Sequence, residues 1–222
     1  MSSAVIVSYD GTPNDDDALV LGRALSREGA GLALAYVRHS REIDPRREEL
    51  ARHDAERRLR AGIDLIGDAA VTAHVLYSAA TADGLQELAA AQDARVLVFG
   101  SDYRTAPGRA EPPNTAQRLL EGSPRAIAIA RAGLRLRPEE PLVTVAGANP
   151  ADDPAVEATV AALSARLSLI RTEAAAGADL IVVGSRPGVG AGRVALSGAA
   201  RGALSTARGS VLVLARERPL TL

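Results

Sequence analysis

Short apolar runs alternate with longer amphipathic segments through the first half of the chain. The runs are almost continuously apolar, which is typical of strands buried on both faces of a parallel sheet. They predict five strands, at VIVSYD, GLALAYVRH, VTAHVLY, RVLVFGS and AIAIA. The segments between them predict helices at NDDDALVLGRALSREG, DPRREELARHDAERRLRAGIDLIG, TADGLQELAAAQD and TAQRLLEG. We expect Asn14 to cap the first helix, because acidic residues follow it and a glycine ends the segment.

The second half shows a shorter version of the same alternation. Strands are predicted at LVTVAG, LIVVGS and SVLVL, with one long helix from Pro154 to about Ala176 and a second helix at GAARGALST. Strict alternation of strands and helices indicates an α/β fold. Residues 134–141 are rich in proline and charge, and we interpret them as a linker.

The two halves repeat each other. The Gly-Ser and Gly-Arg pairs of ADLIVVGSRPGVGAGR align with those of ARVLVFGSDYRTAPGR at one constant offset without a gap, whereas LVTVAGANP aligns with VIVSYDGTP only at a larger offset. The second copy is therefore shorter, and the missing part corresponds to strands two and three and the helix between them. We predict a complete first domain over residues 1–133 and a truncated second domain over residues 142–222.

Composition and charge exclude several classes of function. The chain has 26 basic and 27 acidic residues, and its basic residues are all arginines without a patch in the sequence, so we expect no nucleic acid or membrane partner. Cysteine is absent, the three histidines lie far apart, and no nucleophile elbow occurs. We therefore expect no metal, no catalytic residue and no enzymatic activity. No signal segment or membrane-spanning run is visible, and we expect a cytoplasmic protein.

Three features resemble the universal stress protein family. They are an apolar strand ending in Asp-Gly-Thr-Pro, a late strand ending in Gly-Ser, and a glycine-rich loop followed by a short helix and a last strand. The resemblance implies a flavodoxin-like or Rossmann-like parallel sheet of order 3-2-1-4-5 in the first half and a reduced three-stranded copy of order 1-4-5 in the second. It also implies pairing through strand five, here between the two halves of one chain, and a possible ATP cofactor.

ATP-binding members of that family carry the pattern Gly-x2-Gly-x9-Gly-(Ser/Thr) after strand four. In the second half the pattern falls on Gly184, Pro187, Ser197 and Gly198, and sliding it by one recovers Gly188 but loses the Gly-Ser register. In the first half it falls on Gly100, Tyr103, Pro113 and Asn114, where proline removes an amide donor. The Gly-Arg pairs Gly108-Arg109 and Gly192-Arg193 complete the candidate loop residues.

The first strand and the second strand supply the other candidate nucleotide contacts. The resemblance assigns Asp10 and Gly11 to the ribose side and the strand edge near Val37 to adenine. The second half has Gly147 and Ala148 in place of the first pair and lacks strand two. Neither half thus has a full site, and the loops are either weakened phosphate cradles or inherited connections between strand and helix. The Asp10 carboxylate accepts hydrogen bonds either from ribose hydroxyls or from the backbone amides of the next turn.

Two functions from different classes follow. The first is a non-enzymatic, stress-associated regulatory or interaction protein with degenerate nucleotide sites and no cofactor. The second is an ATP-binding sensor or slow ATP hydrolase that uses the first-half residues. An electron-transfer protein of the same sheet topology has little support, because aromatic residues are scarce.

The truncation also predicts a second chain. If strand one led directly to strand four, the right-handed crossover would place the long helix beside the last helix and leave the other sheet face bare. A bare apolar face requires a cover, so we expect a homodimer or another protein partner.

Overall fold

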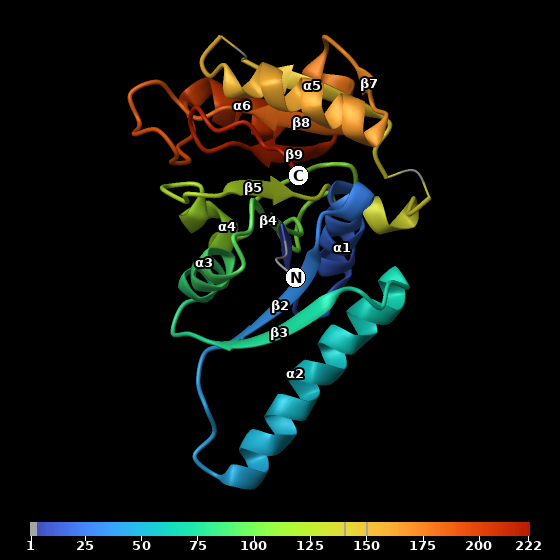
Figure 1. Ribbon diagram of the computed structural model, residues 1–222, viewed down its shortest axis with the longest axis vertical. Coiled ribbons are helices and arrows are strands. Elements are labelled where there is room, and N and C mark those ends of the chain that lie inside the picture. The colour runs from blue at the N-terminus through green and yellow to red at the C-terminus, as the bar shows by residue number, and fades with distance from the viewer. Residues whose placement is uncertain (1–3, 140, 150) are drawn as a thin grey trace.

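The computed structural model describes residues 4–139, 141–149 and 151–222. One nine-stranded sheet runs through both halves in the order β3-β2-β1-β4-β5-β9-β8-β6-β7, with helices on both faces (Figure 1). The strands are β1 (Val5–Ser8), β2 (Leu32–Arg38), β3 (Thr72–Tyr77), β4 (Val96–Phe99), β5 (Ala126–Ile129), β6 (Thr144–Ala148), β7 (Ile170–Arg171), β8 (Leu180–Val183) and β9 (Ser210–Val213). The helices are α1 (Pro13–Ser26), α2 (Pro45–Ile66), α3 (Thr81–Ala91), α4 (Asn114–Leu119), α5 (Ala155–Leu167) and α6 (Gly198–Thr206), with short 3₁₀ turns η1 (Arg27–Gly29), η2 (Leu134–Leu136) and η3 (Ala175–Gly177).

The first half has the expected strand order. Strands β3, β2, β1, β4 and β5 are neighbours in that order and all pair in parallel. The central strands are buried on both faces, as their apolar sequences require. One apolar core joins the sheet to α1 and α2, and a second core joins the opposite face to α3 and α4. The prediction of a flavodoxin-like parallel sheet is confirmed.

The halves join through their strand-five edges. β5 and β9 pair antiparallel, with Ile127 opposite Val213 and Ile129 opposite Val211. Beyond β9 the second half continues through β8 and β6 in parallel, which is the expected order 1-4-5 read from β6 toward the seam. The division into two domains stays a prediction, because one sheet spans both halves.

The second half contains a short strand, β7, that the sequence does not predict. The expected long helix ends at Leu167, where Ser168 takes a left-handed conformation, and the chain then forms β7 beside β6. This two-residue strand pairs in parallel with β6, as β2 pairs with β1, so it occupies the position of strand two. A strand of two residues is too short to show an alternating pattern of apolar and polar residues, so the sequence does not predict it.

The expectation of a bare sheet face is wrong. Helix α5 packs on the face that carries α1 and α2, while α6 packs on the face of α3 and α4. The reason is that α5 connects β6 to β7, which lies on the side of β6 away from β8. A right-handed crossover in that direction places the helix on the α1 face. A homodimer stays a prediction, without the support that a bare face would have given.

Helix α1 begins earlier than the sequence predicts. Thr12 is its N-cap and shares a capping box with Asp15, whose carboxylate accepts from the Thr12 amide at 2.9 Å. Asn14 is therefore not the cap. Its side-chain amide instead donates to the carbonyl oxygen of Ser101 at 2.7 Å and ties the start of α1 to the end of β4.

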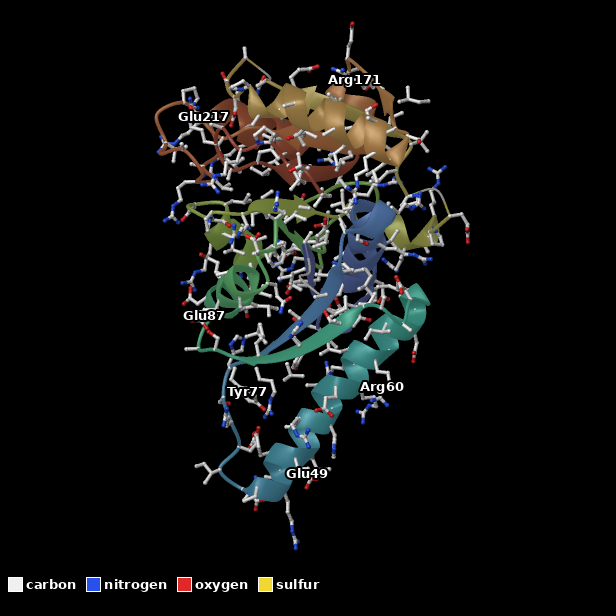
Figure 2. The ribbon with its side chains drawn as sticks, in the orientation of Figure 1. Glu49, Arg60, Tyr77, Glu87, Arg171 and Glu217 are labelled. Atoms are coloured by element: carbon white, nitrogen blue, oxygen red, sulfur yellow. The ribbon has the colours of Figure 1, made fainter. Side chains whose placement is uncertain are left out.

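Helix α2 extends beyond the sheet, with a charged outer surface. Asp44 caps its start, and Gly67 ends it in a left-handed conformation at φ 69°. Figure 2 shows Glu49 and Arg60 on this helix pointing away from the rest of the molecule. No helix of the described residues is long and apolar enough to span a membrane.

The predicted linker is anchored to the first half. Asp17 on α1 is completely buried, and its carboxylate accepts from the amides of Gly133 and Arg135 at 2.8 and 2.7 Å. It also forms an ion pair with the Arg135 guanidinium at 3.0 Å. In the second half the buried Asp153 accepts from the amide of Glu217, which aligns with Gly133 in the repeat. A buried carboxylate thus holds the chain after strand five in both halves.

Candidate functional site

The loop after β4 is held by the serine that follows the strand. The Ser101 hydroxyl donates to the carbonyl of Ala130 at 2.7 Å and accepts from the amide of Glu111 at 3.2 Å. The amide of Gly108 donates to the carbonyl of Ala132 at 2.8 Å. The loop therefore folds back on the segment that leaves β5.

The loop after β8 repeats these bonds at the aligned positions. The Ser185 hydroxyl donates to the carbonyl of Leu214 at 2.7 Å and accepts from the amide of Ala195 at 2.9 Å. The amide of Gly192 donates to the carbonyl of Arg216 at 2.8 Å. The two Gly-Ser pairs thus share one structural role, which is to fasten the loop to the end of strand five.

The glycine before each serine allows a helix to approach the sheet. A Cβ atom at Gly100 would lie 2.1 Å from the backbone oxygen of Asn14 at the start of α1. A Cβ atom at Gly184 would lie 2.5 Å from the Cβ of Asp153, just before α5. Neither position admits a larger residue without movement of a helix. Close helix packing accounts for both glycines without a phosphate.

The Gly-Arg pairs connect the two halves. The Arg109 guanidinium donates to the carbonyl of Ser205 in α6 at 3.1 Å, and the Arg193 guanidinium donates to the carbonyl of Gly122 at 3.0 Å. Gly108 and Gly192 take left-handed conformations before these arginines, with φ of 82° and 75°. These four candidate residues lie at the seam between the halves.

The end of the phosphate pattern forms helix caps. Pro113 is the N-cap of the six-residue α4, and Asn114 is its first residue. Ser197 is the N-cap of α6, where its hydroxyl accepts from the amide of Ala200 at 3.0 Å, and Gly198 begins that helix. Gly188 occupies a left-handed turn at φ 85°, with open space around the position of a Cβ.

A pocket of about 280 Å³ lies at the carboxyl ends of β1 and β4 in the first half. Among the candidate residues of the first half, Asp10 and Gly100 line this pocket, whereas Gly11, Val37, Gly108, Arg109 and Asn114 are not among its lining residues. Val37 is buried in the core against α3. The lining consists of Ser8, Asp10, Thr12, Asn14, Asp15, Thr81, Phe99, Gly100, Ser101, Asp102, Tyr103, Pro113 and Thr115.

The charge of this pocket is negative. Asp10, Asp15 and Asp102 line it, and no basic residue does among the described residues. Partial burial raises the pKa of Asp15, although hydrogen bonds from Thr12 oppose the change. Burial and the neighbouring Asp15 carboxylate also raise the pKa of Asp10. A site that disfavours further negative charge is a poor host for a triphosphate.

Asp15 and Thr12 also line the pocket, although neither is among the residues predicted from the sequence. The spacing Thr-x-x-Asp at residues 12–15 is a capping-box signal and could have located both. Asp15 takes the role considered for Asp10, because it accepts from the amides of Asp10 and Thr12 at 3.1 and 2.9 Å. Among the described residues no group of three acidic or histidine side chains is placed to hold a metal ion.

The fold resembles solved universal stress protein structures along almost the whole chain. A universal stress protein from Archaeoglobus fulgidus DSM 4304 is 13% identical with a TM-score of 0.55, and the match covers 97% of this chain and 100% of that chain. A candidate universal stress protein from Pseudomonas aeruginosa UCBPP-PA14 is 13% identical with a TM-score of 0.61, covering 97% of this chain and 94% of that chain. A functionally unknown protein from Pseudomonas aeruginosa PAO1 is also 13% identical, with a TM-score of 0.62 and 97% and 93% covered. No protein-family model and no curated protein sequence matches the chain.

Proposed function

We propose that this chain is a universal stress protein-like regulatory or interaction protein that performs no catalysis and whose two nucleotide sites are degenerate. Its tandem halves act as one scaffold, joined by β5 and β9. The likeness to universal stress protein structures, at 13% identity, concerns the fold alone. The function rests on the geometry of the loops.

One observation carries the proposal. In both halves the Gly-Ser pair after strand four is occupied by contacts within the protein. Ser101 and Ser185 each bridge the loop to strand five through a 2.7 Å bond, while Gly100 and Gly184 each lie against the start of a helix. A phosphate cradle needs backbone amides that point at the ligand. Here the amides of Gly108 and Gly192 donate to carbonyl groups of the chain.

The first-half pocket supports a second candidate, an ATP-binding sensor or slow ATP hydrolase. Asp10 and Gly100 line the same pocket, which is the arrangement that the resemblance implies. Against this candidate stand the three carboxylates of the lining and the proline at the helix start, because both weaken binding of phosphate oxygens.

Calorimetric titration separates the two candidates. AMP and magnesium-ATP are titrated into the wild-type chain and the Asp10→Asn variant, with native mass spectrometry of the fresh preparation to detect retained nucleotide. We expect no binding that depends on Asp10, since no complete site exists. A micromolar Kd that Asp10→Asn abolishes would overturn the proposal and establish the sensor.

A matched variant checks that the mutation reports on the pocket alone. Asp64 lies on α2, away from the pocket lining, and Asp64→Asn removes the same charge from the molecule. Nucleotide binding that falls equally in Asp10→Asn and Asp64→Asn would reflect net charge and would not support the sensor.

A further inference from the structure

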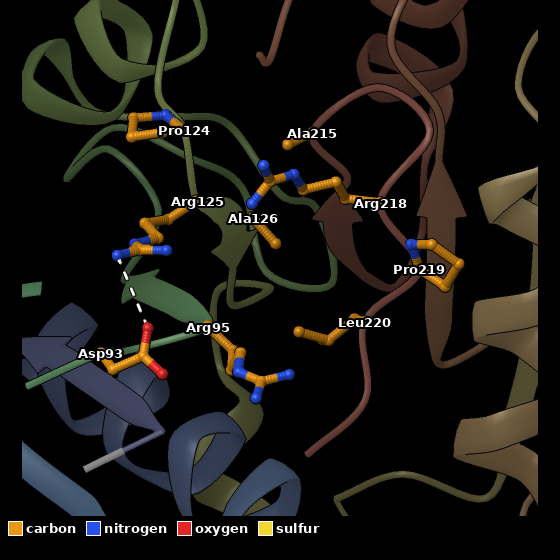
Figure 3. A pocket seen from close by; sticks show the side chains of 9 residues that line it. All are labelled: Asp93, Arg95, Pro124, Arg125, Ala126, Ala215, Arg218, Pro219 and Leu220. Carbon is orange, nitrogen blue, oxygen red and sulfur yellow. Dashed lines mark ion pairs between the residues drawn. The ribbon is translucent and has the colours of Figure 1, made fainter. Parts of the chain in front are cut away.

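Three arginines from distant parts of the chain line one pocket at the seam between the halves. Arg95 precedes β4, Arg125 precedes β5, and Arg218 follows β9 (Figure 3). The pocket has a volume of about 290 Å³ and contains one carboxylate, that of Asp93. We propose that this pocket, called here the seam pocket, binds a small phosphate-bearing anion, with the diphosphate group as the preferred ligand.

The guanidinium groups of the seam pocket have few partners within the protein. Arg125 lies 3.8 Å from the Asp93 carboxylate, which is long for a charged hydrogen bond, and Figure 3 marks this pair. Arg95 donates through one nitrogen to the hydroxyl and carbonyl oxygens of Thr221, at 3.2 and 3.4 Å. Among the described residues, the Arg218 guanidinium has no hydrogen bond or ion pair. Most donors of the cluster remain open to a ligand.

The position of Arg218 is set by the backbone beneath it. A Cβ atom at Gly192 would lie 2.8 Å from Nε of Arg218 and 3.2 Å from Cζ, so the guanidinium lies directly against the glycine. Figure 3 shows this side chain reaching from the C-terminal segment toward Ala126 at the start of β5. A guanidinium that packs on backbone loses less entropy when it binds a ligand than a free side chain does.

The repeat shows that the fold does not require the arginine cluster. The alignment of the two loops places Asp179, Gly209 and Leu134 at the positions of Arg95, Arg125 and Arg218. Asp179 there accepts from the amide of Thr144 at 3.0 Å. One end of the seam thus has three cations where the other has a carboxylate and two uncharged residues. A contact needed only for joining the halves would occur at both ends.

The size and charge of the seam pocket indicate the ligand class. Guanidinium groups form paired hydrogen bonds with phosphate oxygens. The pocket lining carries three positive charges and one negative charge, that of Asp93. The volume lies at the low end of that for small-molecule sites, so a diphosphate fits better than a whole nucleotide. This site is separate from the acidic pocket at Asp10, because the two share no lining residue.

Titration of sodium pyrophosphate in a phosphate-free buffer of low ionic strength tests the proposal. We expect a Kd of about 0.1 mM or lower and weakening with added salt. The variants Arg218→Gln and Arg125→Gln each remove one charged donor, so each should raise the Kd about tenfold or more. Asp93→Asn removes the competing carboxylate and should lower the Kd severalfold. Asparagine also tolerates the left-handed conformation of Asp93, at φ 49°.

A control variant and a check of folding accompany the titration. Arg60→Gln removes an exposed arginine from α2 and should leave pyrophosphate binding unchanged (Figure 2). Three results would each overturn the proposal. The first is no binding of pyrophosphate at about 10 mM. The others are a loss of affinity in Arg60→Gln as large as in Arg218→Gln, and an Asp93→Asn variant that binds pyrophosphate no better than the wild type. Circular dichroism of every variant confirms folding, and Asp93→Asn gives a gain that misfolding cannot imitate.

ADP distinguishes a bare diphosphate from the diphosphate of a nucleotide. If phosphates alone are recognised, ADP should bind no more tightly than pyrophosphate, and both should lose affinity in Arg218→Gln. Nucleotide affinity that disappears in Asp10→Asn but survives in Arg218→Gln would belong to the first-half pocket. That result would contradict the proposed function. The titration with pyrophosphate would still test the seam pocket independently.

Discussion

Substitution of Gly100 by alanine tests whether this glycine serves helix packing. The added Cβ would lie 2.1 Å from the Asn14 backbone oxygen and 2.5 Å from its carbonyl carbon. Normal contacts between carbon and oxygen begin at about 3.3 Å, so α1 would have to move by roughly 1 Å. The movement would strain the 2.7 Å hydrogen bond from Asn14 to Ser101.

The size of the effect follows from these contacts. An extra methyl group in a packed site costs about 1–3 kcal/mol, and a lost hydrogen bond adds about 1 kcal/mol. We expect the free energy of unfolding of Gly100→Ala to fall by about 2–4 kcal/mol. Gly190→Ala is the matched control, because nothing lies within 4 Å of its added Cβ and its φ is not left-handed. It should change stability by less than about 1 kcal/mol.

Urea unfolding provides the measurement. The chain has four tyrosines and no tryptophan, so tyrosine fluorescence and far-ultraviolet circular dichroism serve as two independent probes. Coincident transitions justify a two-state analysis. If Gly100→Ala is as stable as Gly190→Ala, α1 does not press on β4 as described. The explanation of Gly100 by packing would then be refuted, and a role in ligand binding would return.

Three further perturbations have defined outcomes. Asp17→Ala leaves two part-buried backbone amides and the partly exposed Arg135 guanidinium without their acceptor, and two lost hydrogen bonds to a charged group predict a loss of about 3–5 kcal/mol in urea unfolding; a loss below about 1 kcal/mol would contradict this role. Ser101→Ala and Ser185→Ala each remove a loop bond and should accelerate hydrogen exchange at the amides of Glu111 and Ala195. Unchanged protection there would show that the serines do not hold the loops. The hydrogen bond from Arg38 lowers the pKa of Glu48 to about 2. Because a carboxylate with a lowered pKa stabilises only while ionised, the stability difference between wild type and Glu48→Gln should be complete above about pH 5 and disappear as the pH falls toward 2. A difference that persists unchanged at pH 2 would exclude this ion pair as its source.

Much of the fold could be predicted from the sequence because its signals are local. Apolar runs of strand length and segments of helical period predicted the strands and helices of the first half, whereas the strand order came from the resemblance to universal stress proteins. The constant offset between the copies aligned the two loops. That alignment places Ser101 and Ser185 at equivalent positions. The hydrogen bonds of these serines to Ala130 and Leu214 could not be predicted, because they depend on how each loop lies against the end of strand five.

The tertiary structure alone decided the features that depend on distant contacts. The short β7 has no periodic signal, yet it determines the crossover of α5 and so covers the sheet face that was expected to be bare. Gly100 meets Asn14 from a distant part of the chain, and the seam pocket assembles its three arginines from separate segments. Sequence periodicity reports which face of an element is apolar, because that pattern repeats within the element. It does not report which element covers that face or which charges meet there, because these depend on the path of the whole chain.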